Sequence, residues 1–281
     1  MENAFEIKNL NKTYKGFAIK NINLSLPKGY IMGFVGKNGA GKSTTMNCLL
    51  GIVKADSGSI KIFGEEISQL SPQDKEKIGV VLDGFPFADI LTINDIAKIL
   101  SNTYKTWDME KFHTLRKKFS LPMDKAVKEF STGMRAKLNI AIALSHGSQL
   151  LILDEATSGL DPVVRDEILD ILQDFVQDEN HSILISSHIT SDLEKICDYI
   201  AFINDGEIVF VENKDDLLER YAVIHCKNDD FASVDRSAVI GYKQNSFATQ
   251  ALVLKDKITG DFVMDKPSIE DIMLYYTKEE Q

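Results

Sequence analysis

The first part of the chain alternates between apolar and polar positions. Between residues 4 and 35 the alternation is clear at Phe5 and Ile7 and again at Ile22 and Leu24, which is the period of a half-buried strand. The turn formed by Pro27, Lys28 and Gly29 separates this region from a continuous apolar run. The pattern predicts a small antiparallel sheet at the N-terminus.

Short continuous apolar runs then recur along the chain, and each predicts a buried strand. Apolar positions at helical spacing lie between them, as in the predicted helix over residues 163–177, whereas the stretch after residue 63 is read as a polar loop. Strands that alternate with helices indicate a parallel sheet covered on both faces, so the predicted fold class is α/β. The runs are residues 30–35, 59–63, 78–82, 150–153 and 182–186.

Residues 85–147 predict a helical insertion in this α/β pattern. Ile93, Ile96 and Leu100 recur at helical spacing among charged positions. The insertion ends in a long predicted helix that Ser131 caps and that runs through Leu144.

The chain after residue 220 predicts a second, smaller unit. Alternation over residues 222–226 and 250–254 predicts strands, and Pro267 followed by Ser268 predicts the start of a terminal helix. We therefore divide the chain into residues 1–220 and a small α+β accessory domain over residues 221–281.

A glycine-rich stretch directly follows the predicted strand over residues 30–35 and precedes an apolar helical segment. Its spacing is that of a Walker A phosphate loop, in which backbone N–H groups and a helix N-terminus surround an anion. The glycines let the backbone approach phosphate, Lys42 supplies a compact positive charge for the β- and γ-phosphates, and Ser43 supplies a hydroxyl for Mg²⁺. The expected contact residues are Gly36, Asn38, Gly39, Ala40, Gly41, Lys42, Ser43 and Thr44.

Polar residues also follow two later predicted strands. Asp154 and Glu155 come after four apolar residues, which is a Walker B pattern: Asp154 is expected to hold Mg²⁺ and Glu155 to activate water. His188 follows the next strand, where a neutral imidazole would bond the γ-phosphate region. A strand end with one solvated carboxylate is common, but the phosphate loop that precedes this pair in the same sheet makes that explanation improbable here.

Charge and hydropathy limit the function classes. The chain has 32 Lys and Arg against 42 Asp and Glu, a net charge of −10, so nucleic acid is not an expected partner. No apolar run approaches the ~18 residues of a membrane span, and residues Glu2 and Asn3 do not suit a signal peptide. We expect a cytosolic chain unless a partner holds it at a membrane.

These motifs, taken in order from Tyr14 to His188, resemble the nucleotide-binding subunits of ABC transporters. The resemblance implies an ABC ATPase fold: a parallel-sheet core with a P-loop, an N-terminal antiparallel β subdomain, a helical subdomain and a C-terminal accessory domain. It also implies that Tyr14 stacks on adenine and that Asp83 stands at a position that touches Mg²⁺. Ser131 and Gly133 would contact ATP on a second copy in a head-to-tail dimer, and Asp161 would help to hold that copy.

Two of these motifs depart from the family pattern. The usual Leu-Ser-Gly-Gly-Gln is Phe-Ser-Thr-Gly-Met over residues 130–134, which keeps the serine and the second glycine. Asp83 stands where a glutamine is usual; a carboxylate oxygen can still ligate Mg²⁺, but the shorter side chain favours a water-bridged contact over a direct one. Such substitutions resemble those of the branch that exports drugs, peptides or lipids in bacteria.

The resemblance implies an ATP-hydrolysing subunit, paired with a second ATPase subunit, that powers export through a separate polytopic membrane permease at the cytoplasmic face of the membrane. Phe85 and Phe87 are the expected docking residues, with Ile90, Leu91 and Trp107 as further candidates; Trp107 fits the insertion's own core equally well. The alternatives are an ABC-type ATPase without a transport partner and a nucleotide-binding switch. Glu155 argues against the switch, and the absence of a basic surface argues against a role on nucleic acid.

Overall fold

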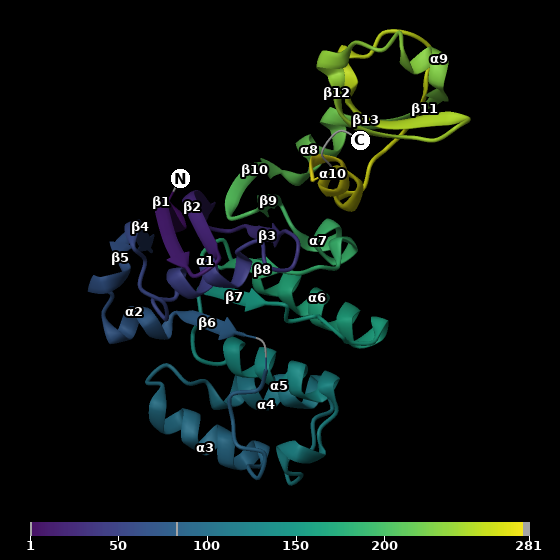
Figure 1. Cartoon of the computed structure of the whole chain (residues 1–281). Helices are drawn as coiled ribbons and strands as arrows, with labels where there is room; N and C mark the ends of the chain where they lie inside the picture. Colours follow the sequence, from purple (N-terminus) through teal and green to yellow (C-terminus); the bar gives the residue numbers. More distant parts are fainter. Residues whose placement is uncertain (1, 83, 278–281) are drawn as a thin grey trace.

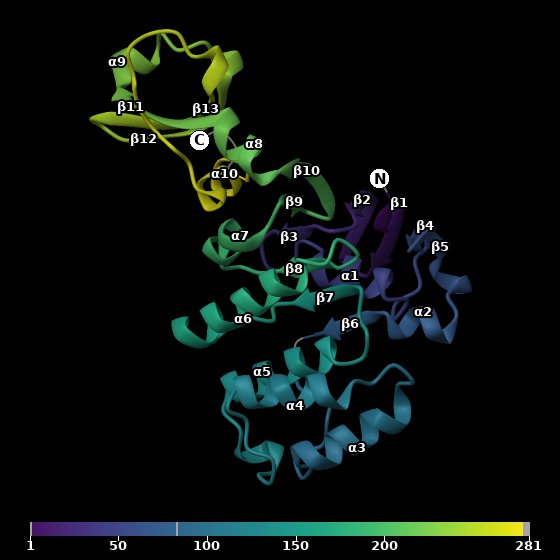
Figure 2. The ribbon, with the colours of Figure 1, turned by 180° about the vertical axis from the view of Figure 1, so that it is seen from behind.

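The computed structural model describes residues 2–82 and 84–277. Three parts follow one another along the molecule, as Figures 1 and 2 show from opposite sides. The central part holds a mixed sheet, the helical subdomain lies at one end of it, and the C-terminal part lies at the other.

A six-stranded sheet forms the centre, in the order β10-β9-β3-β8-β7-β6. β3 runs parallel to β8 and β9, and β7 runs parallel to β6 and β8, whereas β10 is antiparallel to β9. The predicted run over residues 59–63 lies in the N-terminal sheet, whereas the other four predicted apolar runs form strands of this central sheet. The strands are β3 (Ile31–Val35), β6 (Ile78–Val81), β7 (Leu150–Asp154), β8 (Ser182–Ser186), β9 (Tyr199–Asn204) and β10 (Glu207–Asn213).

The predicted N-terminal antiparallel sheet is confirmed, with four strands in the order β2-β1-β4-β5. Its apolar face and α1 (Lys42–Leu49) enclose one core with one face of the central sheet. The strands are β1 (Asn3–Tyr14), β2 (Phe17–Pro27), β4 (Ser57–Ile62) and β5 (Glu65–Glu66).

One expectation in this region is wrong. The stretch after residue 63 is not only a loop: it contains the 3-10 helix η1 (Ile67–Gln69) and the helix α2 (Pro72–Glu76). The side chain of Ser71 accepts a hydrogen bond from the backbone N–H of Asp74, and Pro72 occupies the first helical position. A cap and a proline therefore start a helix that has no apolar face for a periodicity argument to detect.

The helical subdomain consists of α3 (Ile93–Thr103), α4 (Met109–Lys118), η2 (Val127–Glu129) and α5 (Thr132–Leu144). Thr92 and Asp95 form a capping box at α3, and Ser131 caps α5 by accepting from the N–H of Met134, as predicted. Trp107 packs on Phe112 with ring centroids 5.1 Å apart, so it belongs to the core of the subdomain.

The other face of the central sheet is covered by α6 (Pro162–Phe175) and α7 (Thr190–Ile196), and α8 (Lys214–Arg220) leads to the C-terminal part. A four-stranded sheet in the order β12-β13-β11-β14 forms this part, and the predicted cap of Ser268 on its last helix is confirmed. Its elements are β11 (Tyr221–Lys227), α9 (Asn228–Phe231), η3 (Arg236–Ala238), β12 (Val239–Gln244), β13 (Ala248–Leu254), η4 (Lys255–Lys257), β14 (Val263–Asp265) and α10 (Ile269–Tyr276).

The C-terminal part shares a core with the centre of the molecule. One contiguous cluster of buried residues includes Leu193 on α7 together with Val223, Leu252 and Ile272. The backbone N–H of Ile269 also donates to Oε1 of Glu194 at 2.7 Å, so a side chain of α7 caps α10. In the part of the chain that the structure describes, no helix is long and apolar enough to cross a membrane.

Candidate functional site

The site lies at the carboxyl edge of the central sheet, where the parallel strands end together. Ser186 at the end of β8 pairs with Phe34 of β3 on one side and with Asp154 of β7 on the other. The glycine-rich loop after β3, the carboxylates after β7 and His188 after β8 therefore emerge side by side. Ligands of open parallel sheets bind at this edge.

The glycine-rich loop between β3 and α1 has little steric freedom at two of its glycines. A Cβ on Gly36 would lie 2.4 Å from the backbone oxygen of Ile203, and a Cβ on Gly41, which has φ +118°, would lie 2.7 Å from Ile19. Gly39 has φ +82° with open space beside it. The loop therefore packs closely on β9 and β2 at Gly36 and Gly41, whereas the space beside Gly39 is open. The backbone at Gly39 is thus accessible to an anion.

Lys42 is the first residue of α1 and is buried to 7% exposure. Its Nζ donates to the backbone oxygens of Gly36 at 2.8 Å and Lys37 at 3.4 Å, so the ammonium lies over its own loop. Ser43, next in the chain, is exposed at the helix N-terminus. A buried cation inside a ring of backbone groups suits a triphosphate.

Asp154, at the end of β7, is buried to 7% exposure, and its Oδ1 accepts a hydrogen bond from Oγ of Ser186 at 2.5 Å. The same Oγ accepts from the backbone N–H of Glu155 at 3.0 Å. Ser186 therefore fixes both carboxylate residues, although no sequence motif singled it out. Its place in β8, two residues before His188, is the signal that could have found it.

Glu155 turns sharply away from the strand, with φ +53°. A non-glycine residue held in this region stores strain and is typical of functional sites. Its Oε2 lies 2.6 Å from Nδ1 of His188 and 3.4 Å from the backbone N of His188. The structure thus joins two residues that the sequence placed on separate strand ends.

The donor set fits ATP and Mg²⁺. Within residues 2–82 and 84–277, no group of three His, Cys, Asp or Glu residues could hold a metal alone. Mg²⁺ ordinarily takes one or two protein oxygens and completes its shell with phosphate and water. Ser43 and Asp154 offer two such oxygens, and the buried ammonium of Lys42 offers a positive charge for phosphates. Asp83, the third predicted Mg²⁺ position, lies outside the described residues.

Tyr14 lies at the end of β1 with 43% of its side chain exposed. It pairs across the β1–β2 hairpin with Phe17, whose ring lies 3.3 Å from where a Cβ of Gly41 would stand. Nζ of Lys12 lies 5.5 Å from the centroid of the Tyr14 ring, and Asp56 holds Lys12 at 2.9 Å. The hairpin tip thus brings an exposed aromatic ring next to the phosphate loop.

The residues predicted to face a second copy lie on two helices that pack together. Ser131 is exposed at the start of α5, and its hydroxyl accepts from Met134, which leaves the hydroxyl proton free to donate. A Cβ on Gly133 would lie 3.4 Å from Val164 of α6. Asp161 caps α6 by accepting from the N–H groups of Val163 and Val164 at 3.1 Å each.

A phosphate loop, a paired carboxylate and imidazole at neighbouring strand ends, and an inserted helical subdomain define an ATPase of the P-loop class. The family model described as "ABC transporter" matches residues 19–158. The chain is 39% identical over 212 residues to the lantibiotic transport ATP-binding protein SrtF of Streptococcus pyogenes, covering 75% of this chain and 91% of that protein. This chain belongs to the ABC transporter family of ATP-binding subunits, and it is an ATPase.

Two further similarities agree with this family. The chain is 35% identical to the bacitracin transport ATP-binding protein BcrA of Bacillus licheniformis, covering 68% of this chain and 63% of that protein. A dimeric ATP-binding cassette, solved in a post-hydrolysis state with ADP and Pi, superposes with a TM-score of 0.66 and 23% identity, over 74% of this chain and 98% of that chain. The second similarity shows the fold alone.

Proposed function

We propose that this subunit hydrolyses ATP between two head-to-tail copies, or with a close paralogue, and so powers export of a peptide-like antimicrobial compound through a separate membrane permease. The contact between Glu155 and His188 beside the phosphate loop carries the catalytic part of the proposal. The names of two relatives, which transport a lantibiotic and bacitracin, support the substrate class.

In this proposal Lys42 binds the β- and γ-phosphates and exchanges its bonds to loop carbonyls for bonds to phosphate oxygens. Glu155 takes a proton from the attacking water, and His188, whose Nδ1 is held by Glu155, uses Nε2 for the γ-phosphate. Ser43 and Asp154 would hold Mg²⁺, which neutralises phosphate charge. Tyr14 would stack on the adenine ring.

The second copy would complete the site. Ser131 presents a hydroxyl at the N-terminus of α5, where the helix dipole favours an anion, and Gly133 leaves the first turn of that helix narrow. Asp161 lies at the N-terminus of α6, which packs on α5. We propose that these residues meet the nucleotide and the loop of the opposite copy.

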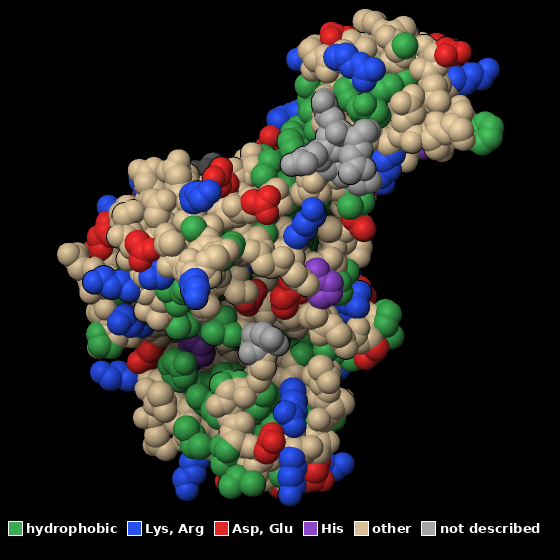
Figure 3. Space-filling model, in the orientation of Figure 1, with side chains coloured by type: hydrophobic (Ala, Val, Ile, Leu, Met, Phe, Trp, Pro, Cys, Tyr) green, Lys and Arg blue, Asp and Glu red, His purple; other side chains and the backbone are tan. Residues whose placement is uncertain are grey.

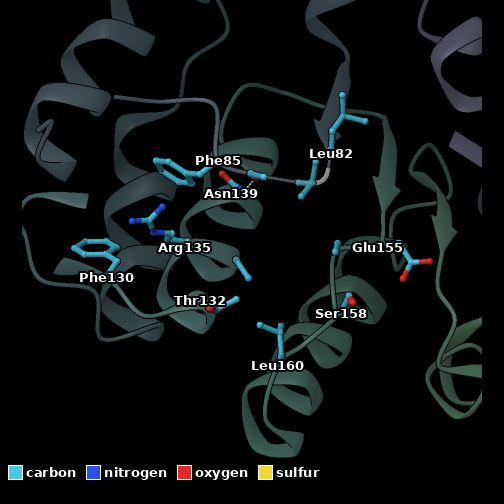
Figure 4. Close-up of a pocket in the computed structure, with 13 residues that line it drawn as sticks. Leu82, Phe85, Phe130, Thr132, Arg135, Asn139, Glu155, Ser158 and Leu160 are labelled. Atoms are coloured by element: carbon cyan, nitrogen blue, oxygen red, sulfur yellow. Dashed lines mark hydrogen bonds between the residues drawn. The ribbon is translucent and has the colours of Figure 1, made fainter. Parts of the chain in front are cut away.

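The permease would dock beside the helical subdomain. A hollow of about 410 Å³ opens there between Phe85, Phe130 and Arg135 on one side and Glu155, Ser158 and Leu160 on the other (Figure 4). Hydrophobic side chains gather over this end of the molecule (Figure 3). Because the hollow reaches Glu155, a segment seated in it would sense the state of the site.

Phe85 and Phe87 form the apolar rim of this surface. Both are half-buried, with ring centroids 5.6 Å apart, and Arg135 lies 5.9 Å from the Phe85 ring while it pairs with Asp89 at 3.3 Å. Ile90 is 77% exposed nearby. The proposed occupant is a short helix of the permease with an apolar face.

Replacing Phe85 and Phe87 together by Glu tests the docking. We expect the isolated variant to keep its circular-dichroism melt and ATP binding but to lose co-purification with a membrane permease encoded beside it. Phe247→Glu is the control, because Phe247 is 85% exposed in the C-terminal part, far along the chain from the hollow. Retained co-purification and transport by the double variant would refute this docking surface.

A further inference from the structure

A buried carboxylate outside the predicted motifs contacts the segments that follow both catalytic residues. Asp192 lies in the first turn of α7, four residues after His188, and is only 4% exposed. Its Oδ2 accepts a hydrogen bond from Oγ1 of Thr157 at 2.9 Å. Thr157 is itself fully buried, two residues after Glu155. One carboxylate oxygen thus ties the segment after His188 to the segment after Glu155.

Arg165 of α6 extends this connection to a third segment. Its Nη2 donates to the backbone oxygen of Leu160 at 3.0 Å, and its Nε lies 3.7 Å from Oδ2 of Asp192. This buried Nε has no hydrogen-bond partner among the described atoms. Leu160 precedes Asp161 in the loop that is proposed to meet a second copy. The guanidinium of Arg165 therefore connects this loop to α7, the helix that follows His188.

Stability alone does not account for this pair. Burial raises the pKa of Asp192, although the hydrogen bond from Thr157 and the charge of Arg165 lower it. The net rise means that burial disfavours the charged carboxylate more than these two partners favour it. Buried ion pairs rarely stabilise a fold more than apolar side chains of the same volume would. The two helices are already joined at the surface, where Lys195 of α7 pairs with Asp166 and Asp170 of α6.

We propose that Asp192 and Arg165 are positioning residues for hydrolysis, which hold His188, Glu155 and the loop before Asp161 in one arrangement. Closure against the second copy then acts on Asp161 and Leu160, and Arg165 and Asp192 transmit it to the His188 segment of the same chain. This inference rests on the catalytic roles proposed for Glu155 and His188. In this role both residues act through other residues rather than on ATP itself.

Steady-state ATPase kinetics of Asp192→Asn and Arg165→Lys test the inference. Asparagine keeps an oxygen for Thr157 but loses the charge facing Arg165, and lysine keeps the charge but cannot reach both partners as a fork. We expect kcat to fall about 10- to 100-fold, as for a small misplacement of reacting groups. The KM for ATP should stay within about twofold, because the phosphate loop is untouched.

A double variant adds a readout that general destabilisation would not move. Asp192→Asn combined with Arg165→Lys should lower kcat little further than either single change, because both remove one coupled pair. A kcat loss equal to the product of the two single losses would overturn the coupling. If Asp192→Asn does not fold, Arg165→Lys carries the test. Its thermal melt shows that it is folded, and its kcat then shows whether the pair is needed for hydrolysis.

Lys195→Gln is the matched control. It removes two ion pairs between the same two helices, but both lie at the surface and involve neither loop. We expect its kcat to stay within about twofold. A loss as large as that of Asp192→Asn, or an unchanged kcat in Asp192→Asn, would overturn the inference. Glu155→Gln separates the catalytic hypothesis from the positioning hypothesis. If Glu155→Gln retains turnover, the proposed catalytic role of Glu155 is wrong. If Glu155→Gln loses turnover while Asp192→Asn stays active, only the positioning role is refuted.

Discussion

Nδ1 of His188 lies 2.6 Å from Oε2 of Glu155, across the ends of two adjacent parallel strands. The contact uses one nitrogen of the imidazole and leaves Nε2 as the nitrogen that can reach a phosphate. It also holds the carboxylate in a single orientation, which a general base needs before water arrives. The side chain of Glu155 is largely buried and that of His188 is half exposed, so the pair sits at the mouth of the site.

Glu155→Gln should keep ATP binding and lose turnover. The amide cannot accept the proton of the attacking water, whereas Lys42 and the phosphate loop are unchanged. We expect kcat to fall by at least about 100-fold, within the usual range for loss of a general base. Calorimetric ATP titration and phosphate release measure the two effects, and size-exclusion chromatography with ATP should show a trapped dimer. Near-normal hydrolysis would contradict the assignment of Glu155.

Composite sites predict complementation between two inactive variants. A mixture of Ser131→Arg and Lys42→Ala subunits forms heterodimers in which Lys42 of one copy faces Ser131 of the other in one intact site. With random pairing and independent sites, the mixture should regain up to about a quarter of the wild-type rate. Subunit exchange is checked by a tag on one variant. A mixture that exchanges but is no more active than its parents would show that catalysis does not use the opposite copy.

Gly36→Ala should destabilise the fold more than Gly39→Ala does. The methyl group at Gly36 would meet the backbone oxygen of Ile203 at 2.4 Å, so β9 or the loop must move, at a cost of about 1–3 kcal/mol or more. At Gly39 the methyl group enters open space, and the cost is the positive φ alone, about 1–2 kcal/mol. We expect only Gly36→Ala to displace the loop from β9. The measurement is the melting temperature, which should fall more in Gly36→Ala than in Gly39→Ala. Equal losses would contradict the close packing of Gly36.

The stability of the fold should depend on pH through His146. Burial lowers the pKa of His146 below its ordinary 6.5, although a hydrogen bond with the backbone oxygen of Glu76 opposes the shift. The folded state then binds fewer protons than the unfolded chain just below pH 6.5, so stability falls as pH falls through that value, by at most about 1.4 kcal/mol per unit.

Urea denaturation at pH 7.5 and 5.5 measures this effect. His146→Gln should lose less stability between the two pH values than the wild-type chain, even though it also loses the stacking of His146 on Tyr104 at 4.4 Å. His113→Gln, which removes a half-buried imidazole of α4, is the control and should retain the wild-type pH difference. An identical pH difference in wild type and His146→Gln would exclude this group as the source.

The sequence alone predicts those parts of the fold whose signal is local. Contiguous apolar runs mark the buried parallel strands, and the caps by Ser131 and Ser268 depend only on residues three positions away. The sequence pattern does not reveal the short helix α2, because α2 has no apolar face. Ser71 before Pro72 is a helix start signal that could have located it. Capping residues therefore locate the start of a helix reliably, whereas hydrophobic periodicity can miss a helix as short as α2.

The parts of the site that the sequence could not predict depend on contacts between distant segments. Thr157 and Asp192 are 35 residues apart in the chain, and Ser186 lies 32 residues from Asp154. A serine in a buried strand and an aspartate in a helix have ordinary explanations until the fold places Ser186 beside Asp154 and Asp192 beside Thr157. The roles assigned to the site residues, from Tyr14 to His188, all stay predictions, because they concern a nucleotide, a metal ion and a second copy.

The apolar cluster that passes from α7 into the C-terminal part bears on how the chain folds. Val223, Leu252 and Ile272 belong to the same buried cluster as Leu193, and Glu194 caps α10, so apolar packing crosses the predicted boundary near residue 220. A chain cut there would expose the apolar sides of α7 and β10 to water. Residues 150–277 are accordingly expected to lose structure in one thermal transition, because the C-terminal part covers part of the apolar cluster that also includes β7 and β8.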